Sequence, residues 1–257
     1  MPNPATSPVQ DLLARYPKAR PELPARFREI YDAQYLDNRS GATAAASAAQ
    51  RLERWMHARV AEDVHAAAPR ATLEIGAGTL NQLPFEPPGA TYDIVEPFEA
   101  LYRDAPGRER IGQVFADIAE APATRRYGRI TSIAAFEHVA DLPALLAKCA
   151  QLLEPDGALR VAIPSEGGLL WRLGWSLTTG LEFRLRHGLD YGVLMRHEHV
   201  NTAREIEGLI HALFAQVEVR ALGLGRQLSL YRFIVAREPR PAVAAEWARR
   251  FGGSTAT

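Results

Sequence analysis

The sequence has 257 residues, which suffices for one α/β domain with an appendage or for two small domains at most. Its 30 basic and 30 acidic residues balance to a net charge of zero, which argues against a nucleic-acid partner or an anionic membrane surface. The single cysteine, Cys149, excludes an intramolecular disulfide framework and any zinc site made of cysteines. The start carries no basic region before an apolar run, and Arg172 interrupts the best candidate for a membrane span. We therefore expect a cytoplasmic protein without stable membrane insertion.

Residues 1–42 are rich in proline and aromatic residues, and a helical pattern begins at Thr43. Pro69 ends this helix, because proline lacks the N–H group that a helix interior needs. Apolar side chains recur along one face of the helix, at Leu52, Trp55, Met56, Val60 and Val64. Because this face could also support a dimer, the pattern leaves a monomer and a homodimer open.

From residue 71 onward, strand and helix patterns alternate. A helix is predicted at 141–153, capped by Asp141, and another follows the capping box of Thr202 and Glu205. This alternation predicts a mostly parallel sheet with helices on both faces, which binds ligands beyond the carboxyl ends of its strands. The predicted strands are 71–75, 92–96, 111–115, 129–134, 158–163, 215–221 and 229–236.

The stretch "TLEIGAGTLNQ", residues 72–82, places a glycine turn directly after the first predicted strand. No lysine follows Gly78, so the turn is not a triphosphate-binding P-loop. The dinucleotide fingerprint needs a third glycine where this chain has Asn81, and the Glu74 carboxylate would repel a pyrophosphate. These departures disfavour an NAD(P)-dependent oxidoreductase.

A carboxylate beside a glycine turn suits a ligand that is cationic there, and several segments in order resemble one family. "LEIGAGT" is similar to the first motif of class I S-adenosylmethionine-dependent methyltransferases, of the bacterial type 11 and type 23 kind. Glu96 in "YDIVEP" occupies the place of the acidic residue that receives the ribose hydroxyls, and Asp117 in "VFADI" that of the residue near the adenine amine. The segments "AAFEHVADL" and "EPDGALRVAIPSEG" resemble the family's fourth and fifth motifs.

This resemblance implies a Rossmann-like, seven-stranded sheet with an antiparallel last strand, and S-adenosyl-L-methionine as cofactor. It implies a lid and helix at 1–68, a methyltransferase domain at 69–240 with a substrate-covering insertion at about 165–201, and a C-terminal tail at 241–257. Arg39 of the lid could pair with the cofactor carboxylate. The implied cofactor-binding residues are Tyr35, Arg39, Glu74, Gly76, Ala77, Gly78, Asn81, Glu96, Pro97, Asp117, Ile118, Ala134 and Phe136.

Methyl transfer from a sulfonium needs positioning in line with the acceptor, and a hydroxyl acceptor also needs a general base. The candidate catalytic residues are His138, after the fourth strand, and His197 and His199 in "MRHEHVN". Structural roles stay open: His138 could cap a helix or pack, and Asp117 could cap the helix that follows it. No carboxylate cluster has a metal-binding spacing, so we predict no metal.

The sequence therefore predicts an S-adenosylmethionine-dependent methyltransferase that acts on oxygen or nitrogen of a small-molecule or sugar acceptor. The resemblance suggests a role in surface-polysaccharide or secondary-metabolite biosynthesis. The chain reads "AAFE" after the fourth predicted strand, where enzymes that methylate bases or amides have an Asn-Pro-Pro-Tyr type motif. A nucleic-acid acceptor is disfavoured accordingly. The remaining alternative is a non-catalytic cofactor-binding module that recruits a partner enzyme.

Overall fold

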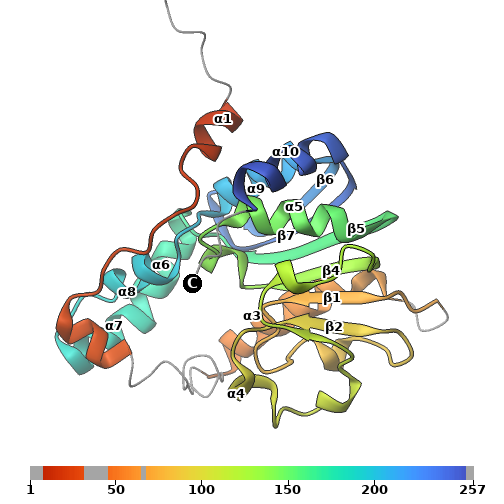
Figure 1. Ribbon diagram of the computed structural model, residues 1–257. Helices are drawn as coiled ribbons and strands as arrows, with labels where there is room; N and C mark the ends of the chain where they lie inside the picture. Colours follow the sequence, from red (N-terminus) through yellow and green to blue (C-terminus); the bar gives the residue numbers. More distant parts are fainter. Residues whose placement is uncertain (1–7, 32–45, 65–67, 253–257) are drawn as a thin grey trace, which may run out of the picture.

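The computed structural model describes residues 8–31, 46–64 and 68–252. Seven strands form one sheet in the order β3-β2-β1-β4-β5-β7-β6 (Figure 1). Neighbouring strands from β3 to β5 are parallel, whereas β7 is antiparallel to both β5 and β6. The predicted Rossmann-like fold is confirmed. The strands are β1 (Thr72–Ile75), β2 (Tyr92–Val95), β3 (Val114–Phe115), β4 (Tyr127–Ile133), β5 (Leu153–Pro164), β6 (Phe214–Leu224) and β7 (Leu228–Pro239).

Helices connect the strands, and residues 25–31 are helical as well. In the described part of the chain, no helix combines the length and the apolar character needed to cross a bilayer. The helices are α1 (Pro8–Leu13), α3 (Ala46–Val60), α4 (Glu99–Tyr102), α5 (Leu142–Leu152), α6 (Leu169–Leu177), α7 (Thr179–His187), α8 (Gly192–Glu198), α9 (Ala203–Leu213) and α10 (Pro241–Phe251). Short 3-10 turns include η2 (Leu83–Phe85), η4 (Ile118–Glu120) and η5 (Phe136–His138).

Two hydrophobic layers hold the sheet between helices, as the alternating pattern predicts. On one face α5, α9 and α10 bury apolar residues in the main core cluster. On the other face α3 packs Met56 and Val60 against Phe233 and Val235 of β7. The predicted caps are confirmed: the Asp141 side chain accepts the Ala144 N–H at the start of α5, and the capping box before α9 is complete. These caps satisfy N–H groups that a helix start leaves free.

The segment predicted as a C-terminal tail contains helix α10, which the sequence analysis did not expect. Pro241 stands in its first turn, where the missing N–H costs nothing. Its buried residues Ala244, Trp247 and Phe251 join the main core cluster. Helix α10 is therefore part of the layer that covers the sheet beside α5.

A second cluster lies away from the sheet and is formed by two distant pieces of chain. Leu23 and Phe27 of the N-terminal segment pack with Phe183 of α7 and Leu194 of α8. We call residues 23–31 and 169–199 together the covering segment. Figure 1 shows α6, α7 and α8 beside the sheet, with the N-terminal segment running along them. Because α6 begins soon after β5 ends, the covering segment lies at the carboxyl ends of the parallel strands.

The Trp247→Ala variant tests whether α10 belongs to the folded core. Trp247 is 2% exposed, so its removal leaves a large cavity and should lower the free energy of unfolding by about 3–5 kcal/mol. Urea unfolding followed by circular dichroism measures this loss. The exposed neighbour Arg249 provides the control, because Arg249→Ala should change the stability by about 0.5 kcal/mol or less. A similar small loss for both variants would contradict the packing of α10.

Candidate functional site

The glycine turn after β1 has a backbone that only glycine tolerates well. Gly76 and Gly78 adopt positive φ angles of 71° and 51°. A Cβ atom at Gly76 would lie 2.6 Å from the Cβ of Ala135, in the segment that leaves β4. A Cβ atom at Gly78 would meet nothing within 4 Å. The turn therefore touches the exit of β4 at Gly76 and presents free space at Gly78, as a backbone that approaches a ligand does.

Glu96 joins the glycine turn to the end of β2. Its carboxylate accepts the N–H of Gly78 at 2.9 Å and the N–H of Phe98 at 3.0 Å. Glu96 is 4% exposed, and Pro97 follows it on the surface. Because β1 and β2 are adjacent and parallel, the structure brings these two predicted motifs together at one edge of the sheet.

Glu74, the acidic residue of the first motif, lies inside the sheet. It is 2% exposed, and its Oε2 accepts a hydrogen bond of 2.8 Å from the Tyr92 hydroxyl. Burial raises its pKa to about 8, although the Tyr92 hydrogen bond acts in the opposite direction. Burial therefore favours the protonated form of Glu74. Its expected contact with the cofactor stays a prediction.

The other predicted residues of the turn and of the segment after β3 form hydrogen bonds within the protein or are buried in it. Asn81 donates from its side chain to Glu53 of α3 at 3.1 Å. Asp117 accepts the Ala119 N–H at 2.7 Å and caps η4, which is the structural alternative considered for it. The side chains of Ala77 and Ile118 are buried. Cofactor contacts by these residues stay predictions.

At the end of β4, Ala134 is exposed and has a φ of 50°. A positive φ is uncommon for alanine and marks a strained turn of the kind that functional sites contain. Phe136 follows in η5 and is fully buried in the main core, so a cofactor could meet only its backbone. Tyr35 and Arg39 lie outside the described residues.

Two of the three candidate catalytic histidines come together beyond β4. The ring centroids of His138 and His199 are 4.9 Å apart, in an edge-to-face arrangement. Nδ1 of His138 contacts the backbone oxygen of Glu198 at 3.0 Å and its carboxylate at 3.2 Å. Nδ1 of His199 contacts the Glu166 carboxylate at 2.7 Å. Buried Glu137 is next to both, with its Oε1 3.9 Å from Nε2 of His138.

The carboxylates of Glu198 and Glu166 beside the histidine pair are favoured in the charged form. Burial alone would raise the pKa of Glu198, but hydrogen bonds from His138 and Tyr31 lower it to about 2. Burial alone would lower the pKa of His138, yet its contacts with Glu198 and Glu137 raise it. The pKa of Glu166 is also lowered, because hydrogen bonds from His199 and Trp171 outweigh its burial. The imidazoles of His138 and His199 are therefore surrounded by negatively charged carboxylates.

His197 does not join this pair. Its Nδ1 contacts the backbone oxygen of Pro21 at 2.7 Å, and its ring meets the ring of Tyr31 edge to face. His197 thus helps to fasten the N-terminal segment to α8. A catalytic role for it stays a prediction.

Asn201 shapes the site although no sequence motif assigned it a role. Asn201 is fully buried and donates to the backbone oxygens of Phe136 at 2.8 Å and of Val139 at 2.7 Å. Its own side-chain oxygen accepts from the Tyr16 hydroxyl at 2.8 Å. Asn201 therefore holds the η5 turn, and with it Glu137 and His138. Its place in "MRHEHVN", just before the capping box, is the signal that could have identified it.

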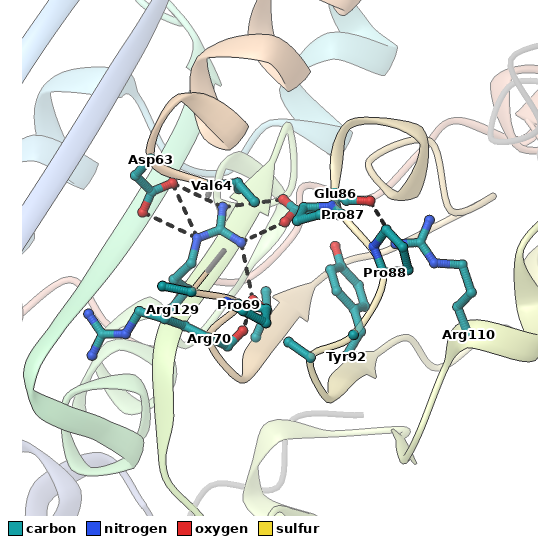
Figure 2. A pocket seen from close by; sticks show the side chains of 14 residues that line it. Asp63, Val64, Pro69, Arg70, Glu86, Pro87, Pro88, Tyr92, Arg110 and Arg129 are labelled. Atoms are coloured by element: carbon teal, nitrogen blue, oxygen red, sulfur yellow. Dashed lines mark hydrogen bonds and ion pairs between the residues drawn. The ribbon is translucent and has the colours of Figure 1, made fainter. Parts of the chain in front are cut away.

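A separate pocket opens at the opposite edge of the sheet, at the amino ends of β1, β2 and β4 (Figure 2). Its central cation, Arg129, donates to Glu86 at 2.7 Å and to Asp63 at 3.2 Å, and also to the backbone oxygen of Val60. Arg110 donates to the backbone oxygens of Leu83 and Glu86. Both arginines already donate hydrogen bonds to acceptors of the protein itself. We therefore interpret the pocket as part of a structural network that connects α3 to the sheet.

Comparisons with known proteins identify the family and the fold. Residues 48–213 match the family described as a methyltransferase domain. An O-methyltransferase family protein from Burkholderia thailandensis is similar in fold, with a TM-score of 0.53 at 16% identity, over 90% of this chain and 69% of that one. A SAM-dependent methyltransferase from Thermotoga maritima has a TM-score of 0.50 at 16% identity, over 83% of this chain and 96% of that one. No protein of curated function matches the sequence.

The contact between the glycine turn and the exit of β4 can be tested by alanine substitution. Gly76→Ala combines a strained φ with a clash against Ala135 and should lower the free energy of unfolding by about 2–4 kcal/mol. Gly78→Ala has the strain without the clash and should cost about 1 kcal/mol. Adding Ala135→Gly to Gly76→Ala should recover part of the loss in urea unfolding. Equal losses for the two single variants, with no recovery, would contradict the close approach.

Proposed function

The chain belongs to the methyltransferase-domain family and is an S-adenosylmethionine-dependent methyltransferase, and we propose that it methylates a hydroxyl group of a small-molecule or sugar acceptor. The cofactor, when bound, supplies a methyl group that its sulfonium already activates. The chain itself must hold the cofactor, place the acceptor in line with that methyl group and manage the acceptor's proton.

For the cofactor we propose the edge formed by the glycine turn and the end of β2. Glu96 is the ribose-binding residue in this proposal, because a carboxylate accepts two hydroxyl hydrogen bonds at once. Its carboxylate accepts the N–H groups of Gly78 and Phe98, which keeps it at the turn. Ala134 at the exit of β4 and Asp117 after β3 line the same edge in this proposal, since the carboxyl ends of parallel strands lie together.

The observation that carries the acceptor proposal is the group formed by Glu137, His138 and His199. It begins two residues after Ala135, the residue that the glycine turn approaches, so it adjoins the proposed cofactor edge. An amine acceptor can react as the free base, whereas a sugar or aliphatic hydroxyl must be activated as the methyl group arrives. The group can do this as a general base or by holding a cation that polarises the hydroxyl. Such a group favours oxygen as the acceptor atom.

A groove beside His199 has the size of a small acceptor. It measures about 400 Å³ and is bordered by the N-terminal segment on one side and by residues of α8 and its exit on the other. Lys18 and Arg15 at its border both pair with Glu205, and Arg196 is exposed there and has no ion pair with any of the described residues. An acceptor with a phosphate, such as a nucleotide sugar, would complement that charge.

The Glu96→Ala variant tests the cofactor edge. Losing the hydrogen bonds to the ribose should weaken binding of S-adenosylmethionine and S-adenosylhomocysteine about 10- to 100-fold in calorimetric titration. Glu99→Ala is the matched control, because Glu99 is exposed and pairs with Arg103 at the surface. NADH should bind neither protein. Unchanged affinity in a folded Glu96→Ala protein would remove Glu96 from the cofactor site.

The His199→Ala variant tests the acceptor proposal with a panel of nucleotide sugars, glycosides and amines. We expect methylation of a hydroxyl by the wild-type chain, detected as an added methyl mass and as released S-adenosylhomocysteine. His199→Ala should lower turnover about 100-fold or more and leave cofactor affinity within twofold. His211→Ala, at an exposed histidine on α9, should behave as wild type. Methylation of an amine at an undiminished rate in His199→Ala would contradict the proposal.

A further inference from the structure

We propose that Glu137, His138 and His199 form a binding site for one divalent transition-metal ion of the Zn²⁺ type. Each residue offers one ligand atom, and the three atoms lie within 4.8 Å of one another. Two imidazoles and one carboxylate are a donor set that suits Zn²⁺ and its first-row neighbours, and suits Mg²⁺ poorly. Three protein ligands would leave a further coordination position open, as catalytic zinc sites do.

The spacing of these atoms is close to that of a bound ion. Ligands at about 2.1 Å from a shared ion lie at most about 4.2 Å from each other. Nε2 of His138 and Oε1 of Glu137 are 3.9 Å apart, which is already within this limit. The three ligand atoms all lie within 4.8 Å of one another, so small rotations of the side chains would bring them within reach of one ion.

The second nitrogen of each imidazole is already oriented as in metal sites. Nδ1 of His138 contacts Glu198, and Nδ1 of His199 contacts the Glu166 carboxylate at 2.7 Å. Because the partner of Nδ1 is an oxygen in both cases, Nδ1 is the donor, and Nε2 is the nitrogen that the neutral ring can offer to a metal ion. Histidines that bind metals almost always have such an oxygen partner on the other nitrogen, and it fixes both the tautomer and the ring orientation. The structure thus shows the ligands together with the groups that support them.

Glu137 gives independent support, because its carboxylate is buried with one oxygen unsatisfied. The side chain is 2% exposed, and Oε2 has no hydrogen-bond partner among the described residues. A buried carboxylate oxygen without a partner is costly, and a cation bound by both Glu137 oxygens, Oε1 beside His138 and Oε2, would satisfy it. Nearby Glu166 and Glu198 add negative charge, so the surroundings favour a cation. Trp171, stacked with His199 and edge to face with Tyr231, provides an apolar wall.

This site deepens the proposed function, since a metal ion there would polarise an acceptor hydroxyl bound at its open position. Metal binding itself requires neither cofactor nor acceptor. It can therefore be measured on the protein alone, and a failure of this inference leaves the proposed acceptor chemistry separately testable through the acceptor panel.

The test is calorimetric titration of the untagged, chelator-treated full chain with Zn²⁺, and with Co²⁺ followed by its visible absorption. We expect one ion per chain, and a Co²⁺ spectrum typical of few-coordinate nitrogen and oxygen ligation. Glu137→Gln and His199→Ala should each weaken Zn²⁺ binding at least 10-fold, whereas His211→Ala and Glu246→Gln, at exposed positions, should not. Mg²⁺ at the same concentration should give no comparable signal.

A thermal shift keeps the test valid if one variant folds poorly. Zn²⁺ should raise the unfolding temperature of the wild-type chain and of His211→Ala, because it binds the folded state. It should give no such rise in His199→Ala or in the more conservative His199→Gln. Absence of stoichiometric binding by the wild-type chain, or equal affinity in the wild type, Glu137→Gln and His199→Ala, would overturn the proposal.

Discussion

The close approach of the exits of β1 and β4 determines how the functional edge of this protein is built. At Gly76 the backbone passes so near to Ala135 that a methyl group would clash, and both glycines of the turn need positive φ angles. This contact places the turn that adjoins Glu96 beside the segment that continues into Glu137 and His138. The proposed donor edge and the proposed acceptor-activating group are therefore neighbours because two parallel strands end side by side.

The N-terminal segment and the insertion after β5 complete this edge from the other side. Leu23 and Phe27 pack with residues of α7 and α8, and Tyr16 reaches Asn201, which holds η5 in place. His199 is carried by the end of this insertion and meets His138 there. The position of one histidine relative to the other thus depends on packing between pieces of chain that are far apart in sequence.

Features that depend on local sequence were predictable, and features that depend on this packing were not. The glycine turn, the acidic end of β2 and the capping box of α9 are each encoded within a few residues, so pattern and spacing sufficed. Helix α10 was missed although local signals for it exist, namely Pro241 in its first turn and apolar residues at helical spacing; its stability comes from burying Trp247 against the main core. The metal prediction relied on spacing alone, which cannot show that Glu137 and His199 face each other after folding.

The most direct test of this account is a crystal structure of the full chain with S-adenosylhomocysteine. We predict that its ribose hydroxyls bind the Glu96 carboxylate, that its chain crosses the glycine turn, and that its sulfur faces the group of Glu137, His138 and His199. The account would be contradicted if the ligand lay in the pocket around Arg129 at the amino ends of the strands. It would equally fail if the sulfur faced away from the histidine pair.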